Sequence, residues 1–299
     1  MDLRSRDGIL HISLMGGQAR AIMIKSTQMV GEAKRIHGLS KIATAALGRT
    51  LIATAMMGSM LKGRDESITA SIKGGGPIGT VLAVANEKCE VKGYVGNPAI
   101  DLPRTGPKLP VGAAVGKDGK LTVIKDMHLR EPYVGQVNLV SGEIAEDFAM
   151  YFTASEQTPS LVSLGVLVSD EKVESAGGLI VQVMPGATEA TIQSIEQSAG
   201  MFMDISGTMK EYHLDGAVNQ LLMHLEPEVL ERRDTRYACD CSRERVERAL
   251  ITLGRDELVD MIEKQHGAQV DCHFCNKRYE FSENDLKTLL TAATSLEDQ

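Results

Sequence analysis

Four of the chain's five cysteines form two close pairs near its C-terminus, and their spacing restricts the possible folds more than any other feature. The pairs are Cys239-Asp240-Cys241 and Cys272-His273-Phe274-Cys275, with thirty residues between them. Two short arms that each supply two sulfurs are typical of a tetrahedral four-thiolate zinc site. Residues i and i+2 of an extended backbone face the same side, so both members of the first pair can reach one ion. We therefore predict one zinc ion per chain, bound by Cys239, Cys241, Cys272 and Cys275.

The cellular compartment affects how the cysteine pairs are interpreted. Residues 1–7 lack the apolar segment of a secretory signal, so we expect a cytoplasmic protein. Thiols stay reduced there, and paired cysteines are metal ligands or redox sensors more often than permanent disulfides. The first pair is also close enough to oxidise internally, and spacing alone leaves open whether the zinc is a structural staple or a sensor. The fifth cysteine, Cys89, stands in a strand-like run and is predicted to be a small core residue.

Composition narrows the possible partners. A length of 299 residues predicts two or three compact units, and the formal net charge of −8 argues against nucleic-acid binding, which depends on clustered Lys and Arg.

Residues 42–61 are mostly apolar, but Arg49 lies near their middle and threonines dilute the rest. A charge at that depth is costly in a bilayer, so we predict a buried helix rather than a membrane span.

The first 184 residues are predicted to form an α+β domain. Period-two alternation predicts strands over 67–72, 121–124 and 136–140, and helical patterns cover 27–36, 42–61 and 145–155. The strands and helices do not alternate regularly, as they would in a parallel sheet, which favours α+β. The glycine-rich segment 74–79 matches G-x-G-x-x-G but precedes strand-like residues 80–84 rather than a helix, so we interpret it as a hairpin turn and predict no nucleotide cofactor.

Two further regions follow this domain. Residues 185–236 are predicted to be a helical linker, with helices at 189–198 and 216–225 and a Met-bearing segment between them. Residues 237–299 are predicted to be a zinc-binding module, in which Ser242 caps a helix that Gly254 ends, a second helix covers 257–263, and Tyr279 and Phe281 alternate on a strand before Ser282 caps a last helix. A domain of roughly 60 residues has a marginal core, so zinc must contribute to its folding.

Two rival functions remain open at this point. A zinc-ribbon regulator would bind nucleic acid, although the acidic balance disfavours it. A thiol oxidoreductase would use Cys272 and Cys275 as a catalytic pair, but it expects a helix opening at the first cysteine, and here a strand follows. The sequence contains no G-x-S-x-G, H-E-x-x-H or lysine-bearing phosphate loop, so we predict a protein that is not an enzyme.

The combined motifs resemble a known family. Cys239-x-Cys241-Ser242-x-Glu244-Arg245, followed by Cys272-His273-Phe274-Cys275, is similar to the C-terminal signature of the 33 kDa chaperonin family, heat shock protein 33. Further segments stand in family order over nearly the whole chain, at 74–79, 140–143, 155–160, 177–178 and 184–186. The resemblance implies an α+β chaperone core over 1–184, a redox-responsive helical linker over 185–236 and a zinc redox-switch domain over 237–299.

The same resemblance implies a function in oxidative stress. The reduced, zinc-bound form would be inactive, and oxidation would form the disulfides Cys239–Cys241 and Cys272–Cys275, release zinc and unfold the linker. The oxidised form would dimerise and hold unfolding client proteins without ATP. Flexible Met-rich surface suits promiscuous binding, so the linker methionines are candidates for client contacts, although core packing is the more common role for any single one of them. They are Met201, Met203, Met209 and Met223.

Overall fold

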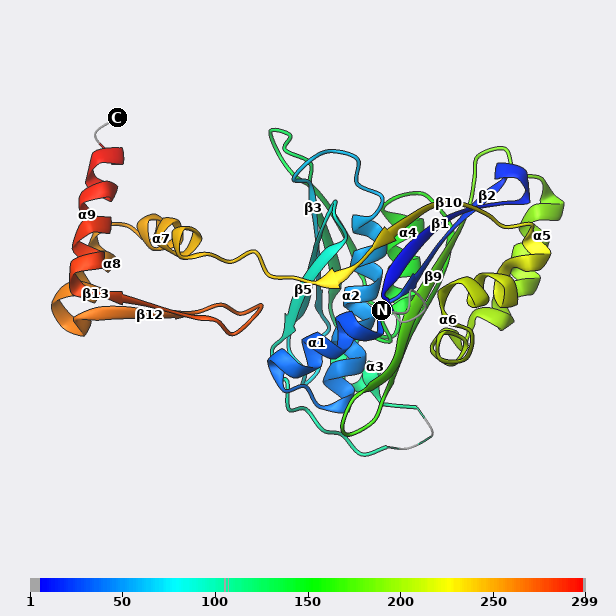
Figure 1. Cartoon of the computed structure of the whole chain (residues 1–299), viewed down its shortest axis with the longest axis horizontal. Helices are drawn as coiled ribbons and strands as arrows, with labels where there is room; N and C mark the ends of the chain where they lie inside the picture. Colours follow the sequence, from blue (N-terminus) through cyan, green and yellow to red (C-terminus); the bar gives the residue numbers. More distant parts are fainter. Residues whose placement is uncertain (1–5, 105, 107, 298–299) are drawn as a thin grey trace. The chain divides into compact units, whose positions relative to one another are not determined.

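The computed structural model describes residues 6–104, 106 and 108–297. The chain divides into two compact units, Met1–Ala238 and Cys239–Gln299 (Figure 1). These are called the N-terminal unit and the C-terminal unit below. The mixture of helices and antiparallel sheets confirms the predicted α+β class.

Two sheets form the framework of the N-terminal unit. One has five strands in the order β10-β1-β2-β9-β8, and the other has six in the order β11-β5-β4-β3-β6-β7. Neighbouring strands are antiparallel except for β11 and β5. The strands are β1 (Gly8–Leu14), β2 (Ala19–Lys25), β3 (Ser67–Lys73), β4 (Val81–Asn86), β5 (Glu90–Val95), β6 (Lys120–Asp126), β7 (Tyr133–Asn138), β8 (Ser160–Val168), β9 (Val173–Val183), β10 (Glu228–Asp234) and β11 (Arg236–Tyr237).

The helices of this unit confirm the predicted helical segments to within a few residues at most ends. They are α1 (Thr27–His37), α2 (Lys41–Gly58), α3 (Val111–Val115), α4 (Ala145–Ala154), α5 (Glu189–Ser198) and α6 (Ile205–Leu222), with short 3-10 turns η2 (Met15–Gly17), η3 (Ala199–Phe202) and η4 (Met223–Leu225). The last predicted helix is longer than expected, because α6 begins eleven residues before 216.

Helix α2 lies between the two sheets and contacts strands of both (Figure 1). Its residues are buried on all sides, as expected for a helix that is apolar around its whole circumference. Ser40 caps it by accepting the Ala43 N–H at 3.1 Å. The charge of Arg49 is paired with Glu143 at 2.7 Å, which explains how a cation is tolerated in this position. Over the described part of the chain, no helix combines the length and apolarity needed to cross a bilayer.

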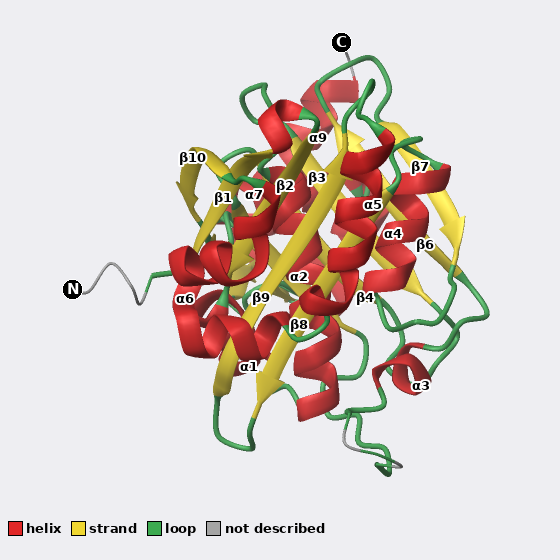
Figure 2. Cartoon of the chain, turned by 90° about the vertical axis from the view of Figure 1, so that its right-hand side faces the viewer, coloured by secondary structure: helices red, strands yellow, loops and turns green. Residues whose placement is uncertain are grey.

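Helices α5 and α6 cover the face of the five-stranded sheet that points away from α2 (Figure 2). This contact forms an apolar cluster separate from the main core. We call residues 189–225, from α5 to η4, the connector, and this cluster the connector cluster. The sheet contributes Leu10, Ile12, Leu14, Ala19, Ala21, Met23, Leu179 and Val181, and the connector contributes Ile195, Phe202, Ile205, Met209, Leu214, Ala217, Val218, Leu221, Leu222 and Leu225.

The sequence prediction was wrong for the residues that follow the connector helices, which form strands. The predicted helical linker extends to residue 236 and the predicted zinc-binding module begins at 237, but residues 228–234 form β10, antiparallel to β1, and residues 236–237 form β11, parallel to β5. We call residues 228–238 the strap. Its pattern of consecutive charges has no period of its own, and its strand conformation comes from pairing with sheet edges that are distant in sequence.

Cys89 is fully buried, as predicted, but its local structure differs from the prediction. It lies in the turn between β4 and β5 with a φ of 59°, not in a strand. The strap passes beside it, because the Thr235 hydroxyl donates a hydrogen bond of 2.8 Å to the Cys89 carbonyl oxygen.

The C-terminal unit has a small core of its own. Its elements are α7 (Arg243–Thr252), α8 (Arg255–Asp260), the π-helical turn η5 (Met261–Gln265), the hairpin of β12 (Gly267–Asp271) and β13 (Arg278–Ser282), and α9 (Glu283–Glu297). The predicted caps are confirmed, since Ser242 accepts the Arg245 N–H and Ser282 accepts the Asp285 N–H. The buried residues are Leu250, Leu258, Ile262, Tyr279, Phe281, Leu286 and Leu289.

Candidate metal centre

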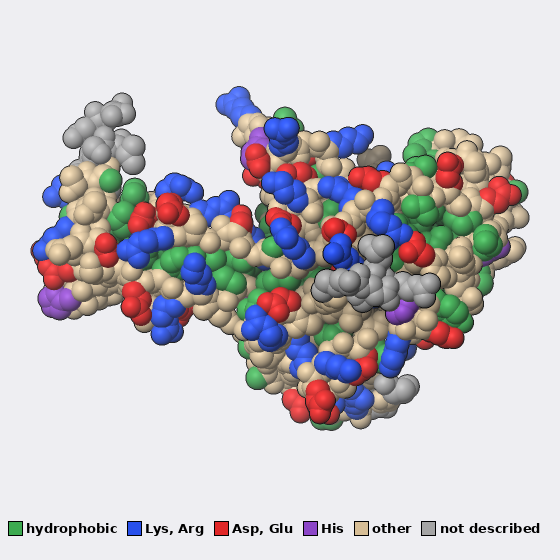
Figure 3. Space-filling view, viewed as in Figure 1, with side chains coloured by type: hydrophobic (Ala, Val, Ile, Leu, Met, Phe, Trp, Pro, Cys, Tyr) green, Lys and Arg blue, Asp and Glu red, His purple; other side chains and the backbone are tan. Residues whose placement is uncertain are grey.

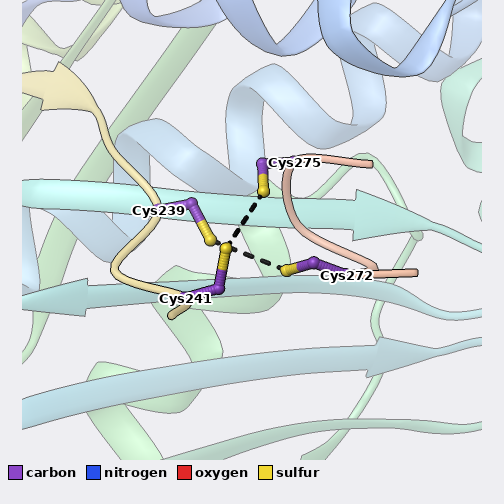
Figure 4. Close-up of side chains that lie close together, drawn as sticks. All are labelled: Cys239, Cys241, Cys272 and Cys275. Atoms are coloured by element: carbon purple, nitrogen blue, oxygen red, sulfur yellow. Dashed lines mark hydrogen bonds between the residues drawn. The ribbon is translucent and has the colours of Figure 1, made fainter. Parts of the chain in front are cut away.

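The four predicted ligands meet in the C-terminal unit. Cys239 and Cys241 lie in the segment before α7, and Cys272 and Cys275 lie in the turn between β12 and β13 (Figure 4). All four sulfurs lie within 4.8 Å of one another. The Sγ–Sγ distance is 3.7 Å between Cys239 and Cys272, and 3.3 Å between Cys241 and Cys275. The two sequence-distant pairs therefore form one cluster.

Backbone hydrogen bonds shape the second arm into a tight turn. The Cys272 carbonyl oxygen accepts the N–H groups of Cys275 at 3.3 Å and Asn276 at 2.8 Å, and the Cys272 N–H donates to Lys277 at 2.9 Å. Asn276 has a φ of 57°, a left-handed conformation that Asn tolerates better than most residues. This geometry turns both thiols of the arm toward the same point.

The sulfur geometry fits a tetrahedral four-thiolate ion. A Zn–S distance of about 2.3 Å corresponds to sulfur separations of roughly 3.8 Å in a regular tetrahedron. Two of the six sulfur–sulfur separations, 3.3 and 3.7 Å, are close to that value, and all six are within 4.8 Å, so a modest rearrangement would let the four thiols hold one ion. Within residues 6–104, 106 and 108–297, no other group of three or more Cys, His, Asp or Glu side chains converges in this way.

The histidines near the cluster are not part of it. His273 is exposed between the two cysteines of the second arm, and His266 is exposed with its Nδ1 3.6 Å from Glu283. This agrees with their interpretation as polar surface residues.

The four thiols differ in their tendency to ionise. Burial raises the pKa of Cys239 and, more weakly, that of Cys275. Burial also opposes ionisation of Cys241, but hydrogen bonds from the Tyr279 hydroxyl and the neighbouring thiols outweigh it and lower the pKa of Cys241 to about 7. Like charges this close disfavour one another, so all four sulfurs can be thiolates together only when a cation neutralises part of their charge.

One contact in the site was not predicted from the sequence. Tyr279 was predicted only as a strand residue that alternates with Phe281, but its hydroxyl donates a hydrogen bond of 3.2 Å to the Cys241 sulfur. Thirty-seven residues lie between the two in the chain, and only a hydroxyl at an inward strand position hinted at a polar partner.

The structure disfavours the alternative interpretations of two motifs, the glycine-rich segment 74–79 and the pair Cys272 and Cys275. Residues 74–79 join β3 to β4, as predicted, and a Cβ added to Gly76 would lie 2.3 Å from the Ala114 carbonyl oxygen. These glycines therefore permit close backbone packing, which leaves the segment no space for a pyrophosphate. Cys272 and Cys275 occupy a turn between two strands, whereas a thiol oxidoreductase of the thioredoxin type places its first cysteine where a helix opens.

Comparisons with known proteins agree with this site and fold. The family model described as Hsp33 protein matches residues 7–282. The 33 kDa chaperonin of Clostridioides difficile is 48% identical over 95% of this chain and 99% of its own length, and that of Bacillus cytotoxicus is 46% identical over 95% and 99%. The crystal structure of the 33 kDa chaperonin of Thermotoga maritima, a heat shock protein 33 homolog, matches with a TM-score of 0.87 at 37% identity, covering 97% of this chain and 99% of that one. The chain therefore belongs to the Hsp33 family, which supports a chaperone function.

Proposed function

We propose that this protein is a redox-regulated holdase that binds unfolding and oxidatively damaged proteins without ATP. Its reduced form binds one zinc ion through the four cysteines and is inactive, and oxidation converts it to the active form. The observation that carries this proposal is the convergence of the four sulfurs in a small unit that directly follows the strap and connector in sequence. Oxidation of the four sulfurs can thus affect the connector, which covers the apolar face of the five-stranded sheet.

The small core of the C-terminal unit supports a folding role for the metal. Structural zinc supplies about 10–16 kcal/mol of apparent binding free energy in small peptides, more than a unit of this size holds in reserve. When bound, the ion keeps the four sulfurs as thiolates, the form that oxidants attack. Removing these ligands should therefore unfold the C-terminal unit.

The proposed oxidation requires a peroxide. A cysteine thiolate attacks one peroxide oxygen, the O–O bond breaks, and hydroxide leaves a sulfenic acid on the sulfur. The neighbouring thiolate displaces hydroxide from that sulfur and forms the disulfide. Two thiolates and one peroxide thus give one disulfide and two hydroxides. We propose the pairs Cys239–Cys241 and Cys272–Cys275, whose formation consumes two peroxides and leaves no thiolate to hold zinc.

Along the chain, the strap joins the connector to the C-terminal unit. Its β10 residues are mostly exposed, so it is held mainly by backbone pairing and a few side-chain hydrogen bonds rather than by apolar burial. Its last pairing, from the Ala238 N–H to the Val91 carbonyl oxygen at 2.9 Å, directly precedes Cys239. Segments with few buried contacts open at low free energy. Unfolding of the C-terminal unit would therefore leave the strap attached by its own weak contacts alone.

The connector is also weakly built. Helix α6 is interrupted at His213, where φ is 57° and ψ is −168°, and short 3-10 turns flank α6 on both sides. If it unfolds, the sheet side of the connector cluster becomes exposed. Met203 and Met223 are already 77% and 61% exposed, whereas Met209 is buried in the cluster. Hydrophobic side chains also reach the surface on the right-hand part of Figure 3, where α5 and α6 lie in Figure 1. Adaptable methionine side chains beside a newly exposed apolar sheet would suit many client sequences.

The remaining parts of the proposal follow from the same arrangement. Newly exposed apolar surface favours association, so the oxidised form is proposed to be a homodimer. The partners are unfolded or partly unfolded proteins in the cytoplasm. The net charge of −8 disfavours nucleic acid, and we propose no catalytic activity.

Light scattering by heat-denatured citrate synthase tests this function. Reduced, zinc-loaded protein should leave aggregation unchanged, whereas protein treated with peroxide at mild heat should suppress it while one zinc per chain is released. A variant with all four cluster cysteines changed to Ser should contain no zinc and should not respond to peroxide. Equal protection by reduced and oxidised wild type would contradict the redox switch, and insulin reduction by the protein would favour a thiol oxidoreductase instead.

A further inference from the structure

Tyr279 is a core residue of the C-terminal unit that carries a hydroxyl. It lies on β13, where it pairs with Val270 of β12, and its side chain is 5% exposed. The alternation of this strand turns Tyr279 and Phe281 into the core, and a phenylalanine would meet the packing need equally well at both positions. A buried hydroxyl is costly unless it is hydrogen-bonded. Its partner is the Cys241 sulfur, at 3.2 Å.

The position of this hydroxyl is firmly set. The β12–β13 register and the hydrogen bond from the Cys272 N–H to Lys277 fix the backbone on both sides of the turn. The Lys277 ammonium lies 5.0 Å from the centre of the Tyr279 ring. A cation over a phenol ring draws electron density toward itself, which strengthens the hydroxyl as a donor. The hydroxyl is thus directed at one particular sulfur of the cluster.

A hydrogen bond to a thiolate sulfur changes its reactivity. The donor stabilises negative charge on the sulfur before reaction, and that charge falls as the sulfur bonds to a peroxide oxygen. An interaction that is stronger in the ground state than in the transition state raises the barrier. We infer that the Tyr279 hydroxyl is a positioning group that slows oxidation of Cys241 and so sets how readily the switch responds to peroxide. This inference rests on the proposed redox function and adds a residue that controls its threshold.

The test compares wild type with Tyr279→Phe, both reduced and loaded with zinc. Stopped-flow measurement of zinc release into a colorimetric chelator, at a fixed excess of hydrogen peroxide, gives the rate without any chaperone assay. Hydrogen bonds to charged groups are among the stronger ones, so we expect release from the variant to be about three- to tenfold faster. Tyr212→Phe, at an exposed position in α6, should release zinc at the wild-type rate.

A second measurement separates lost hydrogen bonding from lost stability. Limited alkylation with N-ethylmaleimide, read for each cysteine by fragment-ion mass spectrometry, should show a selective rise at Cys241 in Tyr279→Phe relative to Cys272. Leu250→Ala, which weakens the same core without a sulfur contact of this kind, should raise all four rates together. If Tyr279→Phe binds no zinc, the test is made within the wild type, in which Cys241 should be alkylated more slowly than Cys272.

The outcomes distinguish the two proposals. Equal zinc-release rates in wild type and Tyr279→Phe, or a uniform rise at all four cysteines, would overturn the role of Tyr279 while leaving the redox switch intact. Failure of peroxide to release zinc from either protein would overturn the proposed function itself.

Discussion

The two units of this chain reach a folded state by different means. The N-terminal unit contains the largest fully buried side chains, those of Phe148, Tyr151 and Phe152, and encloses α2 between two sheets. The C-terminal unit buries few residues, and its four half-buried thiols form one cluster. One unit is stabilised by apolar burial, which oxidants do not affect, whereas the other is proposed to depend on an ion that oxidants can displace. On this proposal, the redox switch lies in the unit with the smaller core.

The largest expected effect tests this contrast directly. Changing Cys272→Ser removes one ligand, and the loss of zinc binding free energy should unfold the C-terminal unit, since structural zinc is worth about 10–16 kcal/mol in peptides. The N-terminal unit should stay folded. Hydrogen exchange followed by mass spectrometry should show loss of protection in α7, α8 and α9 with unchanged protection in α2, and elemental analysis should find no zinc.

Cys89→Ala is the matched control, because it removes a buried thiol from the N-terminal unit. It should retain one zinc per chain and full protection in α7 to α9. Persistent protection of these helices in zinc-free Cys272→Ser would show that the C-terminal unit does not depend on its metal.

The same contrast explains which parts could be predicted from sequence. Helix 189–198, the Ser242 and Ser282 caps and the cysteine cluster depend on residues close in sequence or on a strong ligand pattern, and they were predicted. The strap was not, because Glu228–Asp234 becomes a strand only by pairing with β1, more than two hundred residues earlier. The contact between Tyr279 and Cys241 was missed for the same reason, since it depends on how the hairpin folds back toward the first arm.

We expect the stability of the N-terminal unit to depend on pH through Asp7. Its carboxylate is buried and accepts the Met29 N–H at 2.7 Å, near Lys25. Burial is the largest influence and raises the pKa of Asp7 from 3.8 to about 6, although the backbone hydrogen bonds and Lys25 oppose it. Because the folded pKa is raised, the contribution of this group to stability is complete below about pH 4 and is lost as the pH rises through 6.

Between these pH values, the free energy of unfolding should fall by on the order of 3 kcal/mol, because each pKa unit corresponds to about 1.36 kcal/mol. Asp7→Asn lacks a titrating group, so the difference in melting temperature between wild type and variant should change between pH 4.5 and 7.5 and become constant above it. Both proteins share the same zinc site, whose own titration cancels in this difference. A constant difference across the whole range would show that Asp7 ionises normally in the folded protein.

The smallest expected effect lies in the strap, where the N-terminal unit meets the chain that leads to Cys239. The Tyr237 hydroxyl donates to the Gly93 carbonyl oxygen at 2.9 Å and accepts the Gly93 N–H at 3.3 Å. Removing it with Tyr237→Phe should weaken strap docking by about 1 kcal/mol, which corresponds to roughly fivefold more opening. The zinc site should be unaffected.

Alkylation of Cys89 reports this opening, because the strap hydrogen-bonds to its carbonyl oxygen and the thiol is fully buried. In reduced, zinc-loaded protein, the rate at Cys89 should rise in Tyr237→Phe and stay at the wild-type value in Tyr212→Phe. An unchanged rate at Cys89 would mean that the strap does not control access to this part of the core. A raised rate with zinc still bound would show that the strap can open independently of the C-terminal unit, so that the metal biases a segment already close to release.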